Sequence, residues 1–176
     1  RTRLPTYWQN TDMPKLAVIQ EKILSGDRLD RWLAVSRFKR KKIVFTNGCF
    51  DVLHRGHITY LAKAAALGDV LVIGLNTDAS VKRLKGPSRP GQDEDTRALI
   101  LASLGFVAAV VLFDEDTPYD LIKKVLPDVL VKGGEYKIED IVGYDVVKGK
   151  GGTILTIDMV EGFSSTGIIQ KMKGGS

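Results

Sequence analysis

The chain has 176 residues, 44% of them hydrophobic, which is enough apolar material for one compact domain with a substantial core. Its single cysteine excludes an internal disulfide, and no apolar run is as long as a membrane-spanning helix, so we expect a cytoplasmic protein with no membrane partner. The formal net charge of +5 is compatible with several anionic partners and does not choose among them.

Much of the positive charge lies in the run RFKRKK at residues 37–42. Neither an aromatic-rich sheet motif nor a zinc finger accompanies this run, and such a run is usually a solvated face. We therefore expect no nucleic-acid partner.

The chain begins with a segment that differs from the rest. Residues 1–13 show no periodicity and are expected to run over the surface. Residues 14–24 and 27–38 have helical patterns, and Ser25 and Gly26 separate them. We expect both helices to pack on the core or on a second subunit. Residues 1–41 would thus form an N-terminal extension, and residues 42–173 the main domain.

From residue 42 onward, short β-branched runs alternate with helical patterns. The runs cover residues 43–45, 70–75, 107–112, 129–131 and 153–157. Their hydrophobicity is continuous, which suits parallel strands that are covered on both faces and joined by helical crossovers. The expected helices cover residues 56–67, 93–104, 118–126 and 166–172, with a further helical pattern at 138–148. The pattern predicts an α/β fold, a doubly wound, Rossmann-like parallel sheet of five strands with helices on both faces.

The stretch TNGCFDVLHRGH at residues 46–57 follows the first strand and holds both histidines of the chain, His54 and His57. In open parallel sheets, ligands bind beyond the carboxyl ends of the strands. Gly48 permits close approach of a ligand, and Gly56 leaves backbone N–H groups free to face an anion at a helix start. Both imidazoles could then donate to phosphate oxygens. The alternatives are a pair that caps the helix and a metal pair, although zinc would need more ligands than Cys49 can add.

Residues 48–57, GCFDVLHRGH, resemble the GxFDxxHxGH signature of the nucleotidyltransferase superfamily, which includes glycerol-3-phosphate cytidylyltransferase and phosphopantetheine adenylyltransferase. The wider chain, from about residue 41 to 173, is similar to the D-glycero-β-D-manno-heptose 1-phosphate adenylyltransferases of lipopolysaccharide precursor synthesis. This similarity rests on FTNGCFDVLHRGH, GLNTDASVKRLKGPSRP, EDTPYDLIKKVLPDVLVKGGEY and SSTGIIQKM.

Further polar residues follow the second strand. Asp78 comes at the strand end and could accept hydroxyl protons from a sugar, or it could cap the next helix. The resemblance places Asp78 near the acceptor. Lys82, Arg83, Lys85 and Arg89 are expected to form a mobile basic segment that covers a triphosphate, and the resemblance favours Lys85 as the phosphate-stabilising lysine.

The remaining loops add three expectations. Arg97 matches an arginine of the family, although the acidic stretch GQDEDT precedes it. The acidic residues at 114–116 are expected to cap the helix at Pro118. The paired glycines in KGGEY at residues 132–136 are expected to face ribose and base, and the hydroxyls at residues 164–166 to form a phosphate cradle at a helix start.

The resemblance implies direct transfer of AMP from ATP to a heptose 1-phosphate, with Mg²⁺ arriving on the ATP and no protein metal site. A cytidylyltransferase of glycerol 3-phosphate or another polyol phosphate is the alternative enzyme, and a noncatalytic nucleotide-binding module is the alternative of another class. We expect a homo-oligomer. The implied catalytic residues are His54, His57 and Lys85, and the implied acceptor-binding residues are Asp51, Asp78 and Arg97. The implied nucleotide-binding residues are Thr46, Asn47, Gly48, Cys49, Phe50, Gly56, Lys132, Gly133, Gly134, Ser164, Ser165 and Thr166.

Overall fold

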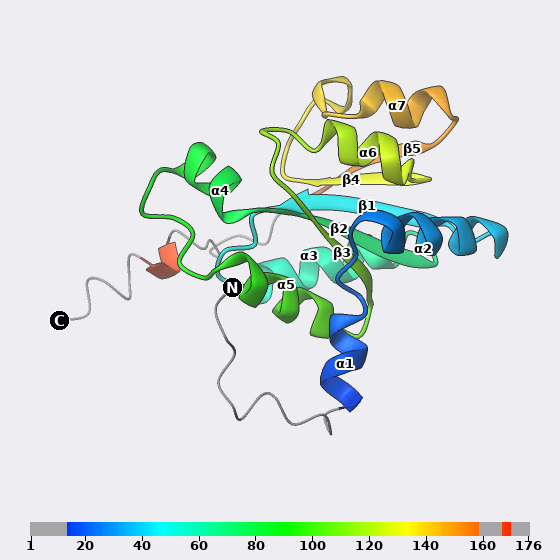
Figure 1. The fold of residues 1–176 in the computed structure, drawn as a ribbon. Helices are drawn as coiled ribbons and strands as arrows, with labels where there is room; N and C mark the ends of the chain where they lie inside the picture. Colours follow the sequence, from blue (N-terminus) through cyan, green and yellow to red (C-terminus); the bar gives the residue numbers. More distant parts are fainter. Residues whose placement is uncertain (1–13, 159–166, 170–176) are drawn as a thin grey trace.

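The computed structural model describes residues 14–158 and 167–169 of the chain. Five parallel strands form one sheet in the order β3-β2-β1-β4-β5 (Figure 1). The strands are β1 (Ile43–Gly48), β2 (Val70–Asn76), β3 (Val107–Phe113), β4 (Val129–Gly133) and β5 (Thr153–Ile157). Each of the five runs predicted from the sequence lies in one of these strands, and the predicted fold class is confirmed.

Helices cover both faces of the sheet, and each face has its own apolar cluster. One cluster joins the sheet to α2 (Gly26–Phe38), α6 (Tyr119–Val125) and α7 (Tyr144–Gly149), with Phe45 and Ile122 fully buried. The other joins it to α3 (Arg55–Ala65) and α5 (Glu94–Ser103), with Leu61 and Ile73 fully buried. A strand that is buried on both faces must be apolar at every position, which explains the continuous hydrophobic runs.

The middle of the sheet opens toward the carboxyl ends of its strands. β1 is in register with β2 along its whole length, from Ile43 to Gly48. Its register with β4 covers only Val44 and Phe45. The order of the strands also reverses at this point, because the chain goes outward from β1 first on one side and then on the other. The gap beyond Phe45 is therefore where the fold predicts a ligand site.

The segment before β1 packs on the domain's own core. Leu29 and Leu33 of α2 are each 2% exposed within the first cluster. Ahead of α2, the backbone N–H of Leu24 donates to the Val110 carbonyl at 2.9 Å, so this segment extends the edge of the sheet at β3. The preceding helix, α1 (Pro14–Gln20), is shorter than the 14–24 expected. Residues 1–13, for which the sequence predicts a surface path, lie outside the described residues.

Two predicted segments differ in the structure. Three residues of the expected mobile basic segment, Lys82, Arg83 and Lys85, instead lie in a helix, α4 (Asp78–Lys85), while Arg89 follows it. Thr77 caps this helix by accepting the N–H of Ser80, and Glu94 accepts the N–H of Asp78 at 2.6 Å. The helical pattern at 138–148 is divided between a short 3₁₀ turn, η2 (Ile138–Asp140), and α7. Gly143 separates the two with φ 87°, a backbone conformation that glycine adopts without steric cost.

Candidate active site

A cavity of about 210 Å³ lies at the carboxyl ends of β1 and β4, where the sheet opens. The signature after β1, the start of α3, the end of α4 and the end of β4 all contribute to it. Its lining consists of Asn47, Gly48, Cys49, Phe50, Asp51, His57, Tyr60, Lys85, Lys132, Gly133 and Tyr136. Nine of the residues singled out from the sequence thus lie together, although they are up to 86 positions apart in the chain (Asn47 to Gly133).

The signature loop is shaped by Phe50, which has φ 42° in the left-handed region and is 7% exposed. Its ring lies edge-on to the His57 ring, with 5.3 Å between centroids. A Cβ atom on Gly48 would lie 3.0 Å from the Phe50 ring, so a side chain at position 48 would displace this ring. A larger residue at position 48 would therefore disturb the ring that packs against His57.

The two histidines form one unit at the start of α3. Nδ1 of His54 accepts the backbone N–H of His57 at 3.4 Å, so His54 is the N-cap of the helix. The two rings are stacked, with centroids 3.8 Å apart and an angle of 21° between their planes. The capping alternative is therefore correct for His54, and it leaves both rings at the anion-attracting end of a helix.

The surroundings of His57 favour its neutral form. Burial lowers its pKa to about 4, and the charges of His54 and Lys85 act in the same direction, while a hydrogen bond with the backbone of Val52 opposes them. Burial also lowers the pKa of His54. The charges of His54 and Lys85 are positive and lower the pKa of His57. A negatively charged ligand in the cavity would act in the opposite direction and raise this pKa.

The lysine at the end of β4 shares this cavity with an aromatic ring. Lys132 Nζ lies 5.9 Å from the centroid of the Tyr136 ring. Burial lowers the pKa of Lys132, and the neighbouring Cys49 opposes this effect. Asn47, Lys132 and Tyr136 also line a second cavity of about 220 Å³ that continues the first toward Pro118 and Ile141. The two cavities adjoin at these three residues.

Tyr60 is a lining residue that the sequence prediction missed. It lies one helical turn after His57, a spacing that puts both side chains on the same face of α3 and was available as a signal. Its Oη lies 2.6 Å from Thr46 Oγ1 and donates to the Val131 carbonyl at 3.3 Å. Burial raises the pKa of Tyr60 to about 12. The side chain of Thr46, expected to bind nucleotide, is instead fully buried and holds Tyr60.

Asp51, expected to bind the acceptor, supports a loop in this structure. Its side chain has no exposed surface and accepts Nε–H of Arg89 at 2.5 Å, the N–H of Gly91 at 2.6 Å and the N–H of Gln92 at 3.3 Å. Burial acts to raise its pKa, but these three donors outweigh burial and the pKa lies below 3.8. Asp51 thus supports the segment before α5, and its expected contact with the acceptor stays a prediction.

Arg97, also expected at the acceptor, is 1% exposed. Its guanidinium donates to the carbonyls of Gln92 (3.0 Å), Cys49 (2.7 Å) and Asn76 (2.9 Å), and to Asp78 Oδ1 at 2.7 Å. Protein oxygens therefore accept hydrogen bonds from all three guanidinium nitrogens, so Arg97 holds together the loops around the signature, and its expected contact with the acceptor stays a prediction. Asp78 keeps 29% of its side chain exposed, so one side of it still faces solvent.

The acidic residues after β3 do not cap α6, which has no side-chain cap. Arg83 of α4 pairs with Asp116 at 2.9 Å and with Asp114, whose carbonyl it also contacts. The expected capping role is therefore wrong, and the reason is that α4, unforeseen as a helix, carries Arg83 to this loop. The acidic stretch before Arg97 has a related explanation, since Asp93 caps α5 by accepting the N–H of Thr96 at 2.7 Å.

The other residues singled out from the sequence divide into three groups. Gly56 is buried at the start of α3, and Gly134 follows β4 with φ 102°. Lys85, at the end of α4, lines the cavity. Ser164, Ser165 and Thr166 lie outside the described residues, and residues 167–169 after them are helical. Within 14–158 and 167–169, no group of three His, Cys, Asp or Glu side chains could hold a metal ion, and no helix is long and apolar enough to cross a membrane.

A parallel sheet of this strand order, with a histidine pair at the start of α3 and lysines from α4 and β4 at the same edge, is the arrangement expected of a nucleotidyltransferase domain. Comparison with known proteins agrees. The family model described as cytidylyltransferase-like matches residues 45–171, and the chain belongs to this family.

Two curated relatives and two solved structures illustrate the likeness. The bifunctional protein HldE of Campylobacter concisus is 55% identical over 157 residues, which are 89% of this chain and 32% of that protein. HldE of a Nitratiruptor species is 58% identical over 133 residues, 76% of this chain and 28% of the relative. The chain thus spans roughly a third of the length of these relatives.

The lipopolysaccharide core biosynthesis protein from Thermoplasma volcanium has a TM-score of 0.56 and 29% identity, over 68% of this chain and 97% of that one. Pantoate-beta-alanine ligase from Francisella tularensis has a TM-score of 0.54 over 86% of this chain and 76% of that one, and at 16% identity it shares the fold. The relatives confirm the resemblance seen in the signature, and both structures confirm the fold class.

Proposed function

We propose that the chain transfers AMP from ATP to D-glycero-β-D-manno-heptose 1-phosphate and produces ADP-heptose and pyrophosphate. The observation that carries the proposal is the cavity in which His57, Lys85 and Lys132 meet at the carboxyl edge of the sheet. These are donors for a polyphosphate. The choice of ATP and heptose rests on the similar sequence stretches and on the lipopolysaccharide core biosynthesis protein among the structural neighbours.

The proposed reaction is one in-line displacement. An oxygen of the sugar's phosphate attacks the α-phosphorus of ATP, a new P–O–P bond forms, and the bond between the α-phosphorus and the bridging oxygen breaks so that pyrophosphate leaves with the electron pair. A phosphate monoester is already ionised near neutral pH, so the attacking group needs no strong general base. Catalysis then depends on positioning and on charge stabilisation around the phosphates.

In this mechanism the histidines hold the phosphates and Lys85 stabilises the charge that develops on the leaving group. The low pKa of His57 keeps the ring neutral before ATP arrives. A bound polyanion favours the charged imidazolium, so ATP binding is expected to raise this pKa and to take up a proton from solvent at mildly acidic pH. Stacking on His54 and the edge contact with Phe50 keep the ring in place during this change.

We expect magnesium to arrive with ATP. Among the described residues no three candidate ligands cluster, and the carboxylate in the cavity lining, Asp51, accepts hydrogen bonds from Arg89 and two backbone N–H groups. Hard cations bind phosphate oxygens readily, and on ATP the ion would neutralise part of the triphosphate charge.

The test is an assay of pyrophosphate release with product mass, using ATP or CTP against heptose 1-phosphate or glycerol 3-phosphate. We expect ADP-heptose from ATP and the heptose. His57→Ala should lower turnover by about a hundredfold or more, the scale of losing one oxyanion donor. Lys63→Ala, an exposed position on the same helix, is the matched control and should keep the full rate.

Each alternative gives a different result in this assay. CDP-glycerol as the product would establish the cytidylyltransferase instead. Binding of ATP without turnover of any acceptor would favour a noncatalytic module. A folded His57→Ala variant with a near-normal rate would remove His57 from the mechanism even if ADP-heptose is formed.

A further inference from the structure

A second cavity, of about 630 Å³, lies at the opposite edge of the sheet from the candidate active site. It is bounded by Ile43, the first residue of β1, by Asp128, which directly precedes β4, and by Thr153, the first residue of β5. The strands are parallel, so these amino ends lie a full strand length away from the cavity of His57. The two cavities share no lining residue.

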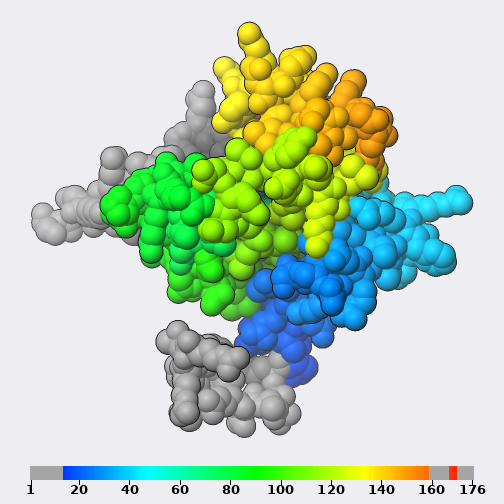
Figure 2. All heavy atoms as spheres, turned by 45° about the horizontal axis from the view of Figure 1, so that its top comes forward, coloured from blue at the N-terminus to red at the C-terminus, as the bar shows by residue number. Residues whose placement is uncertain are grey.

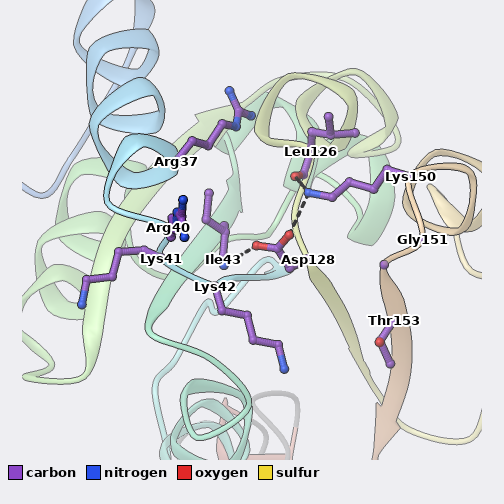
Figure 3. A pocket seen from close by; sticks show the side chains of 11 residues that line it. Arg37, Arg40, Lys41, Lys42, Ile43, Leu126, Asp128, Lys150, Gly151 and Thr153 are labelled. Atoms are coloured by element: carbon purple, nitrogen blue, oxygen red, sulfur yellow. Dashed lines mark hydrogen bonds and ion pairs between the residues drawn. The ribbon is translucent and has the colours of Figure 1, made fainter.

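This amino-edge cavity is strongly basic. Its lining contains five cationic side chains, from the end of α2, the segment after it and the turn before β5, and they are Arg37, Arg40, Lys41, Lys42 and Lys150. Among the described residues, Asp128 is the one carboxylate in the lining, and Asp69 nearby accepts the backbone N–H of Lys42. Figure 3 shows Lys150 reaching Asp128 from one side of the cavity, with Arg37, Arg40 and Lys41 arranged along the other.

The carboxylate is already committed to the protein. Asp128 accepts the N–H of Ile43 at 2.8 Å and pairs with Lys150 at 2.9 Å (Figure 3). Burial acts to raise the pKa of Asp128, but these two donors and the charge of Lys42 outweigh it, so the pKa lies below 3.8. Lys150 also donates to the Leu126 carbonyl at 2.7 Å. The acid therefore neutralises Lys150 and leaves the cations on the α2 side without a carboxylate partner in the described part of the chain.

The cations on the α2 side are fixed in different ways. Arg37 donates to the Val125 carbonyl at 2.9 Å and to the Lys124 carbonyl at 3.4 Å, which anchors its guanidinium at one wall. Arg40 has φ 52°, at the position after a helix C-cap where glycine is usual, so an arginine there has a steric cost that glycine would avoid. The light-blue segment at the end of α2 projects from the surface in Figure 2. Positive side chains that lie close together in one cavity repel one another, and binding of an anion there would reduce this repulsion.

We propose that the amino-edge cavity binds a small ligand that carries linked phosphate groups, such as pyrophosphate or the phosphate chain of a nucleotide. Arginine and lysine side chains around one concave surface are the donors that phosphate oxygens prefer. A volume of about 630 Å³ lies within the range of cavities that hold small organic ligands, so it can accommodate more than a single phosphate. The site is independent of the proposed transfer reaction, because it uses none of the same residues.

The test is calorimetric titration of the protein with pyrophosphate, ADP and ATP at constant ionic strength, without a sugar acceptor. The double variant Lys41→Gln/Lys42→Gln removes two lining charges, and Lys39→Gln/Lys148→Gln removes the same charge from exposed positions outside the lining. We expect the lining variant to lose one binding site per chain, or to bind there at least tenfold more weakly, while the control variant matches the wild type. His57→Ala should keep the amino-edge site, which separates this result from failure of the proposed function.

Equal binding by the lining and control variants would overturn the proposal. So would binding that disappears equally in every variant at higher salt, because it would reflect net charge only. If the amino-edge site takes pyrophosphate and ATP with the same affinity, the phosphate chain alone is recognised. Tighter binding of ATP than of pyrophosphate would show that the nucleoside contributes.

Discussion

Replacement of Arg97 by methionine should destabilise the domain strongly, although Arg97 lies outside the cavity lining. Methionine fills similar space but donates nothing, so the carbonyls of Cys49, Asn76 and Gln92 would lose a charged donor and Asp78 its partner. Breaking a buried ion pair by removing one partner costs about 3–5 kcal/mol. Against a typical domain stability of about 5–15 kcal/mol, this is a large fraction.

The assay is urea denaturation followed by circular dichroism, with Arg83→Met as the matched control. Arg83 is also paired with carboxylates, but its side chain is 46% exposed and its partners Asp114 and Asp116 are 62% and 73% exposed. Solvent screens exposed ion pairs, so Arg83→Met should shift the unfolding free energy far less than Arg97→Met does. Equal shifts in the unfolding free energy for Arg97→Met and Arg83→Met would refute the claim that the buried contacts of Arg97 stabilise the domain.

Three further predictions concern the carboxyl edge of the sheet. Asp51→Asn and Arg89→Gln should each lower transfer by about tenfold or more, and the double variant should be hardly worse, since residues in one network are not additive. Lys85→Met should lower kcat/KM for ATP by about tenfold or more while changing the unfolding free energy by less than about 0.5 kcal/mol, because Lys85 is exposed. The pKa of His57 is about 4 when folded and near 6.5 when unfolded, so its contribution to stability is complete above pH 6.5 and is lost as the pH falls toward 4. The stability of the wild type relative to His57→Gln, measured from urea midpoints, should therefore fall between pH 7 and about pH 5, and parallel pH profiles would contradict the shifted pKa.

The sheet was predictable because a parallel strand that is covered on both faces has a continuous apolar sequence. Each of the five strands contains such an apolar run, so it can be recognised from consecutive residues alone. The signature was predictable for a similar reason, since a strand end, glycines and a helix start are adjacent in the chain. These patterns predict that His57 lies at the carboxyl edge of the sheet and that Lys132 lies close to it.

What the sequence did not predict depends on contacts between distant segments. α4 was missed because its first turn is stabilised by Glu94, sixteen positions further on, and its end by the pairing of Arg83 with Asp116. Asp51 and Arg97 were expected to bind the acceptor because the family resemblance implied that role. Their burial could be known only once α5 and the loop before it were placed against the signature.

The charged residues at the carboxyl edge divide between two tasks according to their side-chain chemistry. The arginines hold its loops together: Arg89 and Arg97 use planar, multiply donating guanidinium groups to join the loops after β1 and β2 to the segment before α5. Buried ion pairs seldom add stability over apolar replacements, so their value here is that they fix loops that have no regular structure of their own. Lys85 and Lys132 line the cavity and, in the part of the chain that the structure describes, neither forms an ion pair with a carboxylate. Their charge thus remains available to a ligand, while Arg89 and Arg97 fix the loops that surround the cavity.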